Sequence, residues 1–188
     1  NYKIKEGDVY YFNGYEAKHD YALDEKGNAM FLNKENNPEG TPKENLKPIY
    51  TIKELEKQFE FSNDDIGDIF DEGKFQRDKG LINELYSSKG YLYVQVMPKR
   101  KNLELTNENL LQYENCVGFT DKNSCEEEKK RLNIDKLRKL LTKNPTYAGR
   151  KFEHVDFTIR ENFLAYIENI VIKGNKKTLD KVIRRELL

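Results

Sequence analysis

The sequence predicts an α+β fold, a β-α-α-β-β module in which two antiparallel helices cover one face of a three-stranded mixed sheet. Three observations support this prediction. A strand–turn–strand pattern near the start of the chain recurs near its end, two stretches have the apolar spacing of helices, and two others alternate as half-buried strands do. A further helical pattern lies between the last two strands, so we also expect a helical insertion there.

The repeated pattern can be followed residue by residue. Residues 2–7 (Tyr-Lys-Ile-Lys-Glu-Gly) lead into an apolar stretch at 9–17, and residues 157–162 (Phe-Thr-Ile-Arg-Glu-Asn) lead into another at 164–172. A repeat at a fixed offset is typical of tandem modules, although two β-rich segments can also resemble each other by chance. We therefore expect three parts: the end of one module at 1–8, a complete module at 9–162 and the start of another at 163–188.

The complete module should open with a strand at 9–18, followed by a long excursion at 19–50. Within the excursion, Lys26-Gly27-Asn28 is a turn sequence between two short apolar stretches, which indicates a small extra hairpin. The prolines and glycine between residues 33 and 48 indicate surface loop.

Two helices should follow the excursion. Thr51 and Glu54 have the spacing of a capping box, in which the two side chains satisfy free N–H groups of the first helical turn. Lys89-Gly90 is a typical C-cap for the second helix. Residues at helical spacing define the buried faces: Ile52, Leu55 and Phe59 in the first helix, and Phe75, Leu81, Ile82, Leu85 and Tyr86 in the second.

The second strand of the predicted sheet is the alternating stretch 91–97, and Pro98 should stop it. Alternation places every second side chain on the same face. We expect Leu92, Val94 and Val96 to face the helices, and Tyr91, Tyr93 and Gln95 to face outward.

A polar insertion should occupy 99–150 and the third strand 151–160. Ser124 and Glu127 have capping-box spacing, and Ile134, Leu137, Leu140 and Leu141 give an amphipathic helix that Asn144-Pro145 breaks. In the third strand, we expect Val155, Phe157 and Ile159 to face inward and His154, Asp156, Thr158 and Arg160 outward. The second face of the sheet should then stay open to solvent.

Composition argues against a nucleic-acid partner. The chain of 188 residues contains 33 basic and 33 acidic residues, whereas a protein that neutralises phosphates should have a basic excess. No apolar run approaches the roughly 20 residues that span a bilayer, and no secretory signal opens the chain.

Two cysteines, Cys116 and Cys125, lie nine residues apart in a polar stretch. They could form a small disulfide loop in an oxidising compartment, or they could be two unrelated free thiols. A metal site is not favoured, because no histidine or second cysteine pair lies near them in the sequence.

Patterns that would indicate an enzyme are missing from the sequence. The two histidines, His19 and His154, lie in no Ser-His-Asp or Cys-His pattern, and no glycine-rich loop could cradle phosphate. The acidic residues at 64–72 lack the fixed positions and closing glutamate of a calcium loop. We therefore expect no catalytic residue, no cofactor and no metal site.

Several of these segments together resemble the POTRA (polypeptide-transport-associated) domains of the BamA family, the core of the outer-membrane β-barrel assembly machinery. The resemblance covers 1–18, 51–98 and 151–188 and leaves out 19–50 and 99–150. Three sets of residues carry it: Ile4-Lys5-Glu6-Gly7 before the opening strand, Asp78 through Leu85-Tyr86 and Lys89-Gly90-Tyr91 with Val94, Val96 and Pro98, and Ile167 through Asn175 with Thr178 and Val182-Ile183-Arg184-Arg185-Glu186-Leu187. The sequence departs from the family at His19-Asp20, where the family usually has Gly-Asn, and by the long insertion.

This resemblance implies a non-catalytic interaction module at the periplasmic face of the outer membrane, within a protein whose membrane-embedded barrel lies outside this stretch. It also implies partners: unfolded outer-membrane proteins, accessory lipoproteins or other subunits of the assembly complex, and adjacent POTRA modules. The POTRA region of a two-partner-secretion transporter is the alternative. A lone POTRA module, as in cell-division proteins, fits less well because of the repeat.

The binding site that we expect is an edge strand of the sheet. An uncovered edge presents N–H and C=O groups that can pair with an extended segment of another chain, which is the β-augmentation proposed for the family. The alternative is an edge that stays solvated or is covered by the insertion. The expected edge residues are Tyr91, Leu92, Tyr93, Val94, Gln95, Val96 and Met97.

Overall fold

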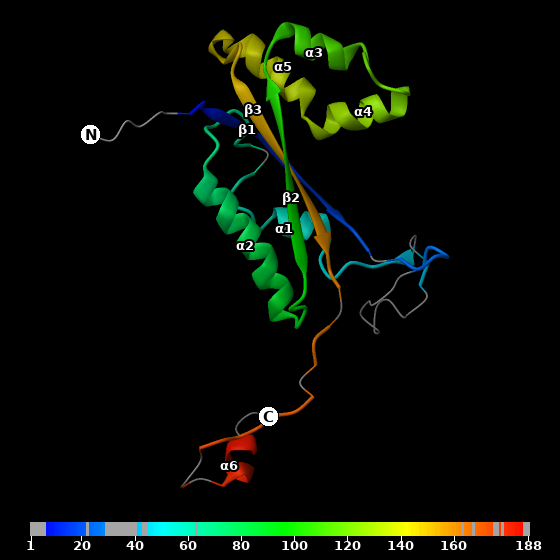
Figure 1. Ribbon diagram of the computed structural model, residues 1–188. Coiled ribbons are helices and arrows are strands. Elements are labelled where there is room, and N and C mark those ends of the chain that lie inside the picture. Colours follow the sequence, from blue (N-terminus) through cyan, green and yellow to red (C-terminus); the bar gives the residue numbers. More distant parts are fainter. Residues whose placement is uncertain are drawn as a thin grey trace, which may run out of the picture.

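A computed structural model of the chain describes residues 7–21, 23–28, 41–42, 45–62, 64–162, 164–166, 168–174, 177 and 179–185. The elements are β1 (Tyr10–His19), α1 (Ile52–Glu56), α2 (Glu72–Ser88), β2 (Gln95–Glu104), α3 (Asn107–Glu114), α4 (Lys122–Arg131), α5 (Ile134–Lys143), a 3-10 turn (Pro145–Tyr147), β3 (Lys151–Arg160) and α6 (Asp180–Arg185). The predicted order β-α-α-β-β, with a helical insertion before the last strand, is confirmed (Figure 1).

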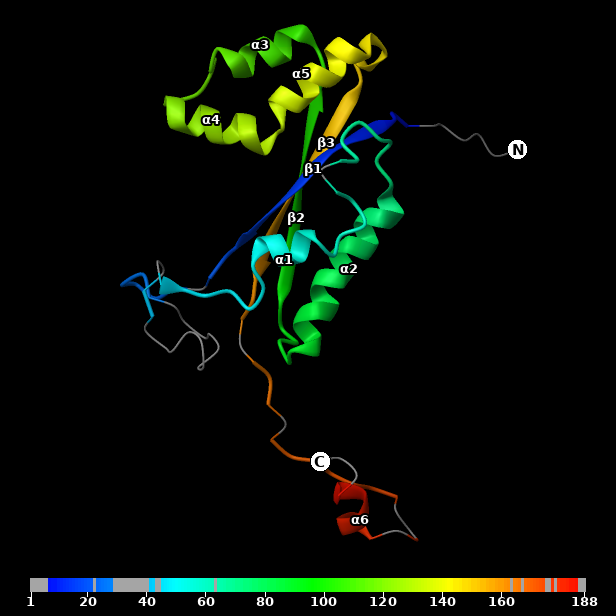
Figure 2. The same ribbon diagram turned by 180° about the vertical axis from the view of Figure 1, so that it is seen from behind.

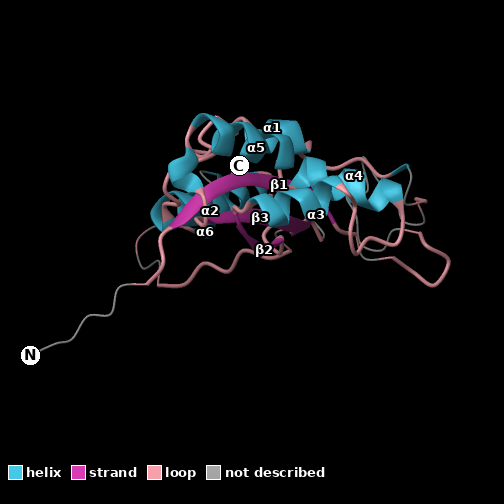
Figure 3. Cartoon of the chain, turned by 90° about the horizontal axis from the view of Figure 1, so that it is seen from above, coloured by secondary structure: helices cyan, strands magenta, loops and turns pink. Residues whose placement is uncertain are grey.

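The sheet has the strand order β1-β3-β2. β3 is the central strand, parallel to β1 and antiparallel to β2, so the sheet is mixed as predicted. Seen from above, the three strands follow one another in this order (Figure 3). The central strand is therefore the last of the three in the sequence, and the insertion lies between it and its neighbour β2.

One face of the sheet packs on α1 and α2 (Figure 2). Thr51 and Glu54 form the predicted capping box at the start of α1, and Asp71 caps α2 by accepting from the backbone N–H groups of Gly73 and Lys74. The core here is mostly aromatic. Its fully buried members include Phe12, Leu55, Phe75, Ile82, Tyr86, Val155, Phe157 and Ile159.

The second face is partly covered, which corrects the expectation of an open face. Helices α3, α4 and α5 fold back over the end of the sheet where β3 begins (Figure 1), and their apolar residues pack on Leu103 and Phe152 to form a second core. His154 and Asp156, expected to face solvent, are buried on this face. They are buried because the insertion returns to the sheet from which it leaves.

The second strand differs from its predicted range. β2 begins at Gln95, whereas the preceding four residues form a turn stabilised by the Tyr91 N–H bond to the Tyr86 carbonyl. The prediction of which side chains face the helices is wrong at the start of this stretch, because Tyr91 is 3% exposed and Leu92 is 62% exposed. It is confirmed for Val94 and Val96, which pack against the first core, and for the exposed Tyr93 and Gln95. The expectation that Pro98 stops the strand is wrong, since β2 continues through it to Glu104.

Other expectations meet the structure in part. α4 begins one turn earlier than expected, because Asp121 caps it by accepting from the Ser124 N–H and Ser124 is not the cap. The turn at Lys26-Gly27-Asn28 is present, closed by the Asp24 N–H bond to the Asn28 carbonyl. Most of the second arm of the predicted hairpin, and the predicted closing strand at 2–6, lie outside the described residues.

The described residues of 164–172 form no strand, although a strand was predicted there. A strand needs a neighbour to pair its backbone groups, and the described part of the chain places none beside it. Instead the segment leads away from the sheet to α6, the helix expected after it (Figure 1). No helix in the described part of the chain is long and apolar enough to cross a bilayer.

Candidate protein-binding edge

β2 lies at an edge of the sheet, with β3 as its neighbour on one side. Two hydrogen bonds show which of its backbone groups face β3. The Ile159 carbonyl accepts from Asp20 on the β1 side, so Ile159 and its partner Val96 form a pair without mutual hydrogen bonds. The Leu105 N–H bonds to the Arg150 carbonyl at the other end of the ladder. Because the pattern alternates, the odd-numbered residues of β2 bond to β3 and the even-numbered ones point outward.

The outward row therefore consists of Val96, Pro98, Arg100, Asn102 and Glu104. Pro98 has no N–H group, and at this position none is needed for the ladder, which explains why the strand continues through it. The row ends at Glu104, whose carbonyl accepts from the Asn109 side chain at 2.7 Å. In the described part of the chain, no backbone group pairs with the row between Val96 and Asn102.

The opposite edge, along β1, is less accessible. Residues 67–70 cover its first half through bonds such as Phe12 N–H to Asp68 O at 2.8 Å and Phe70 N–H to Tyr10 O at 2.9 Å. A bulge follows, because Asn13 and Gly14 together stand opposite a single residue of β3. Covering segments and bulges are common protections of sheet edges. β2 is therefore the better candidate for pairing with another chain.

Charges along β2 are mostly neutralised within the molecule. The Arg100 guanidinium lies 2.7 Å from Glu72 and 3.2 Å from Glu153, and it stacks 4.3 Å from the centre of the Phe75 ring. Lys101 pairs with Glu128 of α4. Burial raises the pKa of Glu153 and lowers the pKa of Lys101, which reflects the partly covered position of both groups. Because Arg100 and Lys101 are each paired with a carboxylate, they do not form a strongly basic surface.

Part of the second face of β2 is not covered by the insertion. Gln95, Met97 and Lys99 are exposed on the second face, and Met97 is 40% exposed. A guest strand beside β2 would therefore find apolar and basic side chains together, next to a solvent-accessible backbone.

Of the seven residues predicted for the edge, the structure places Gln95, Val96 and Met97 in the edge strand. Tyr91 to Val94 lie in the preceding turn, where the side chain of Tyr91 is buried and the carbonyl of Tyr93 accepts from Asn162. Sequence reasoning missed the second half of the edge, from Pro98 to Glu104. Leu103 and Leu105 continue the alternation beyond the proline, and this was the available signal.

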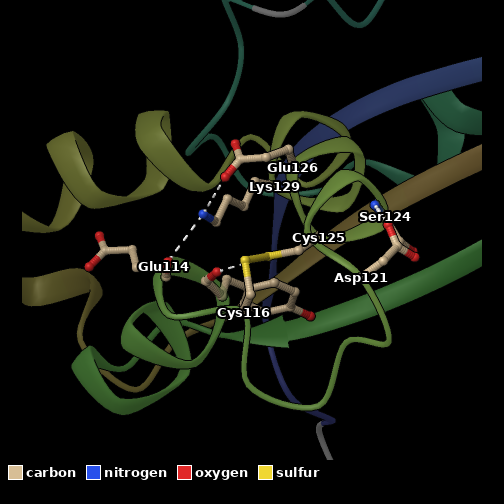
Figure 4. The surroundings of a disulfide bond; sticks show 8 residues. Glu114, Cys116, Asp121, Ser124, Cys125, Glu126 and Lys129 are labelled. Atoms are coloured by element: carbon tan, nitrogen blue, oxygen red, sulfur yellow. Dashed lines mark hydrogen bonds and ion pairs between the residues drawn. A yellow bond between two sulfur atoms is a disulfide. The ribbon is translucent and has the colours of Figure 1, made fainter.

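A disulfide joins Cys116, at the end of α3, to Cys125 in α4, with their Cα atoms 5.6 Å apart. Figure 4 shows the surroundings of this bond: Lys129 donates to the Glu114 carbonyl and to the Glu126 carboxylate, so a second link joins the same two helices. The disulfide and this lysine hold α3 and α4 together at the outer end of the insertion.

Three side chains could hold a metal ion between the sheet and α4. Candidate ligand atoms of Glu16, His154 and Asp156 lie within 4.8 Å of one another, beside a surface cavity of about 670 Å³. However, Arg131 already supplies positive charge, because its guanidinium lies 3.5 Å from Asp156 and 4.0 Å from Glu16. A cation would have to compete with this arginine, so the group is better explained as an ion-pair network.

The POTRA family model, described as the surface antigen variable number repeat, matches residues 40–114. This stretch contains α1, α2, β2 and α3, whereas β1 and β3 lie outside it. No curated protein and no solved structure matches the chain. Together with the β-α-α-β-β order and the mixed three-stranded sheet, the family match supports a POTRA domain in this chain.

Proposed function

We propose that this chain is a non-catalytic interaction module of a BamA-like outer-membrane assembly protein, located at the periplasmic face of the outer membrane. The family match supports a POTRA domain, and POTRA domains are interaction modules of outer-membrane assembly or secretion. The proposed guests are unfolded outer-membrane proteins and accessory subunits of the assembly complex. The guests add a strand to the sheet at β2.

The accessible backbone of β2 is the observation that carries this proposal. Val96, Arg100 and Asn102 offer N–H and C=O groups outward, and Pro98 offers a carbonyl. Each hydrogen bond to a guest contributes only about 0.5–1.5 kcal/mol net. Ordering an unfolded guest opposes much of this gain. Binding should therefore be weak, tolerant of guest sequence and quickly reversed, as transfer of unfolded chains requires.

The POTRA region of a two-partner-secretion transporter remains the alternative within the same family of modules. It would use the same edge, so the edge experiment does not separate the two. The range of proteins that bind separates the two alternatives. An assembly protein should bind many unfolded outer-membrane proteins, whereas a dedicated transporter should bind one secreted partner.

The edge can be blocked without breaking the sheet. Because the Asn102 N–H points away from β3, Asn102→Pro should leave the ladder intact, as Pro98 does, while its ring replaces an outward donor. We expect a synthetic strand peptide of alternating apolar and polar residues to shift the amide signals of Val96, Arg100 and Asn102 in NMR titrations. Asn102→Pro should weaken this binding about tenfold or more, the effect of losing one hydrogen bond and adding a steric clash.

Asn102→Ala is the matched control, because it removes the same side chain and keeps the N–H group. It should bind the peptide as the parent chain does. Equal affinity of the proline and alanine variants, or shifts confined to residues outside β2, would contradict strand addition at this edge.

A further inference from the structure

The residues that follow β3 do not leave the module directly. Glu161, the first of them, is 1% exposed. Its carboxylate accepts from the Tyr86 hydroxyl at 2.8 Å and from the Ile49 N–H at 2.9 Å, and His19 Nδ1 lies 3.6 Å from the same oxygen. The end of β3 is thus joined to α2, to the loop before α1 and to the end of β1.

Burial of this cluster affects its ionisable groups. It raises the pKa of Glu161 and lowers the pKa of His19, and it raises the pKa of Tyr86 together with the nearby Glu161 charge. A carboxylate placed here without donors would be costly, so Tyr86 and the Ile49 N–H are needed to keep Glu161 in this position.

Three of the residues that follow, Asn162, Leu164 and Ala165, contact the turn between α2 and β2 or the core beside it. The Asn162 side chain donates to the Tyr93 carbonyl at 2.5 Å, and the Ala165 N–H donates to the Gly90 carbonyl at 2.9 Å. Asn162 has a φ of +55°, a left-handed conformation that asparagine tolerates better than most residues. Leu164 packs against the first core. Several independent contacts therefore hold this segment.

Gly90 is required for this contact for two reasons. Its φ of +86° favours glycine, and a Cβ atom built on it would lie 2.8 Å from the Cδ1 atom of Leu164. The backbone at Gly90 can therefore approach Leu164 and Ala165 only because it has no side chain. Among the described residues beyond Ala165, side chains are again exposed: Tyr166 is 75% exposed and Val171 is 73% exposed.

We propose that Tyr86, Gly90 and Tyr93 form a linker seat, which binds residues 161–165 and sets the direction in which the chain leaves the module. The seat makes the segment that follows β3 a rigid joint, without a proline or a helix. It would limit how far a following module can bend relative to this one.

The repeat extends this inference to the preceding joint. Glu6 corresponds to Glu161 in the repeat. We therefore expect Glu6 to be held in the same way by a tyrosine or backbone N–H group of a preceding module. A buried glutamate at the end of the last strand would then mark each joint.

Amide exchange and ¹⁵N relaxation of the 188-residue chain test the seat. In the parent chain, the Ala165 amide should be protected, and residues 161–165 should have order parameters near the value of about 0.85 that is typical of rigid backbone. Tyr86→Phe removes only the hydroxyl that binds Glu161. It should speed exchange of the Ala165 amide about tenfold, while the Phe157 amide in β3 changes little. Gly90→Ala should have a larger effect of the same kind.

Gly80→Ala is the control for the glycine variant. Gly80 lies within α2, the helix that Gly90 follows, and a Cβ atom at Gly80 meets nothing within 4 Å. It should leave the Ala165 amide unchanged. An Ala165 amide that exchanges at the rate of an unstructured chain would overturn the proposal. So would variants that leave Ala165 unchanged, or that speed Ala165 and Phe157 equally, since the second result reports loosening of the whole fold. None of these results depends on guest binding at β2.

Discussion

Replacement of Phe157 by alanine should lower the free energy of unfolding by about 3–5 kcal/mol. Phe157 lies on the central strand, is fully buried, and contacts the rings of Tyr15 and Phe75 at centroid distances of 5.1 and 6.0 Å. Removing it opens a cavity between the sheet and both covering helices, where rigid neighbours cannot collapse to fill the space. Chemical denaturation followed by circular dichroism measures the change.

Thr158→Ala is the control on the same strand, since Thr158 is half-buried on the second face. It should cost less than about 1 kcal/mol, because the substitution removes no large buried group. If Phe157→Ala cost no more than Thr158→Ala, the first core would not be the main source of stability, and the packing described for α1 and α2 would be wrong.

Reduction of the Cys116–Cys125 disulfide should lower the stability of the insertion by about 2–3 kcal/mol, the value expected for a closed loop of this length. Cys125 is fully buried between the helices, so loss of the bond frees α3 from α4 without removing the apolar contact of its side chain. NMR amide exchange with and without a reducing agent measures the change. Amides of α3 and α4 should exchange faster, and those of α2 should change little.

The Cys116→Ser variant separates the bond from the reagent. It should show the same faster exchange in α3 and α4 without any reductant, and adding reductant should have no further effect. Unchanged exchange in both experiments would mean that Lys129 and the apolar contacts alone hold the two helices together.

Local patterns predicted the elements well where the physical cause is local. The capping box of Thr51 and Glu54 depends on two residues three positions apart, and the amphipathic spacing of α5 depends on one helical face. β3 alternates in sequence from His154 to Arg160, and its apolar residues Val155, Phe157 and Ile159 face the first core as expected.

The sequence predictions that were wrong concern features that depend on distant parts of the chain. Pro98 ends a strand in the middle of a sheet but not at an edge, and only the strand order shows that β2 lies at the edge. The short turn before β2 buries Tyr91, which alternation alone could not show. His154 and Asp156 are polar by sequence, and they are buried because α4 comes to lie over them.

Helix caps illustrate a different limit. Asp121 and Ser124 are both suitable cap residues and lie three positions apart, so the capping-box spacing of Ser124 and Glu127 was ambiguous. In the structure Asp121 accepts from the Ser124 N–H at 2.8 Å, which places the cap one turn earlier than predicted.

The insertion cannot be regarded as a removable appendage. Phe152 and Leu103 belong to the sheet, yet their apolar neighbours come from α3 and α5, and the buried carboxylate of Asp156 has its arginine on α4. Shortening this segment to a tight hairpin would expose the apolar side chains of Phe152 and Leu103 on the bare sheet. Homologues with a short connection should therefore carry polar residues where this chain has Phe152 and Leu103, and loop-grafting between such proteins should succeed only when the sheet residues are exchanged as well.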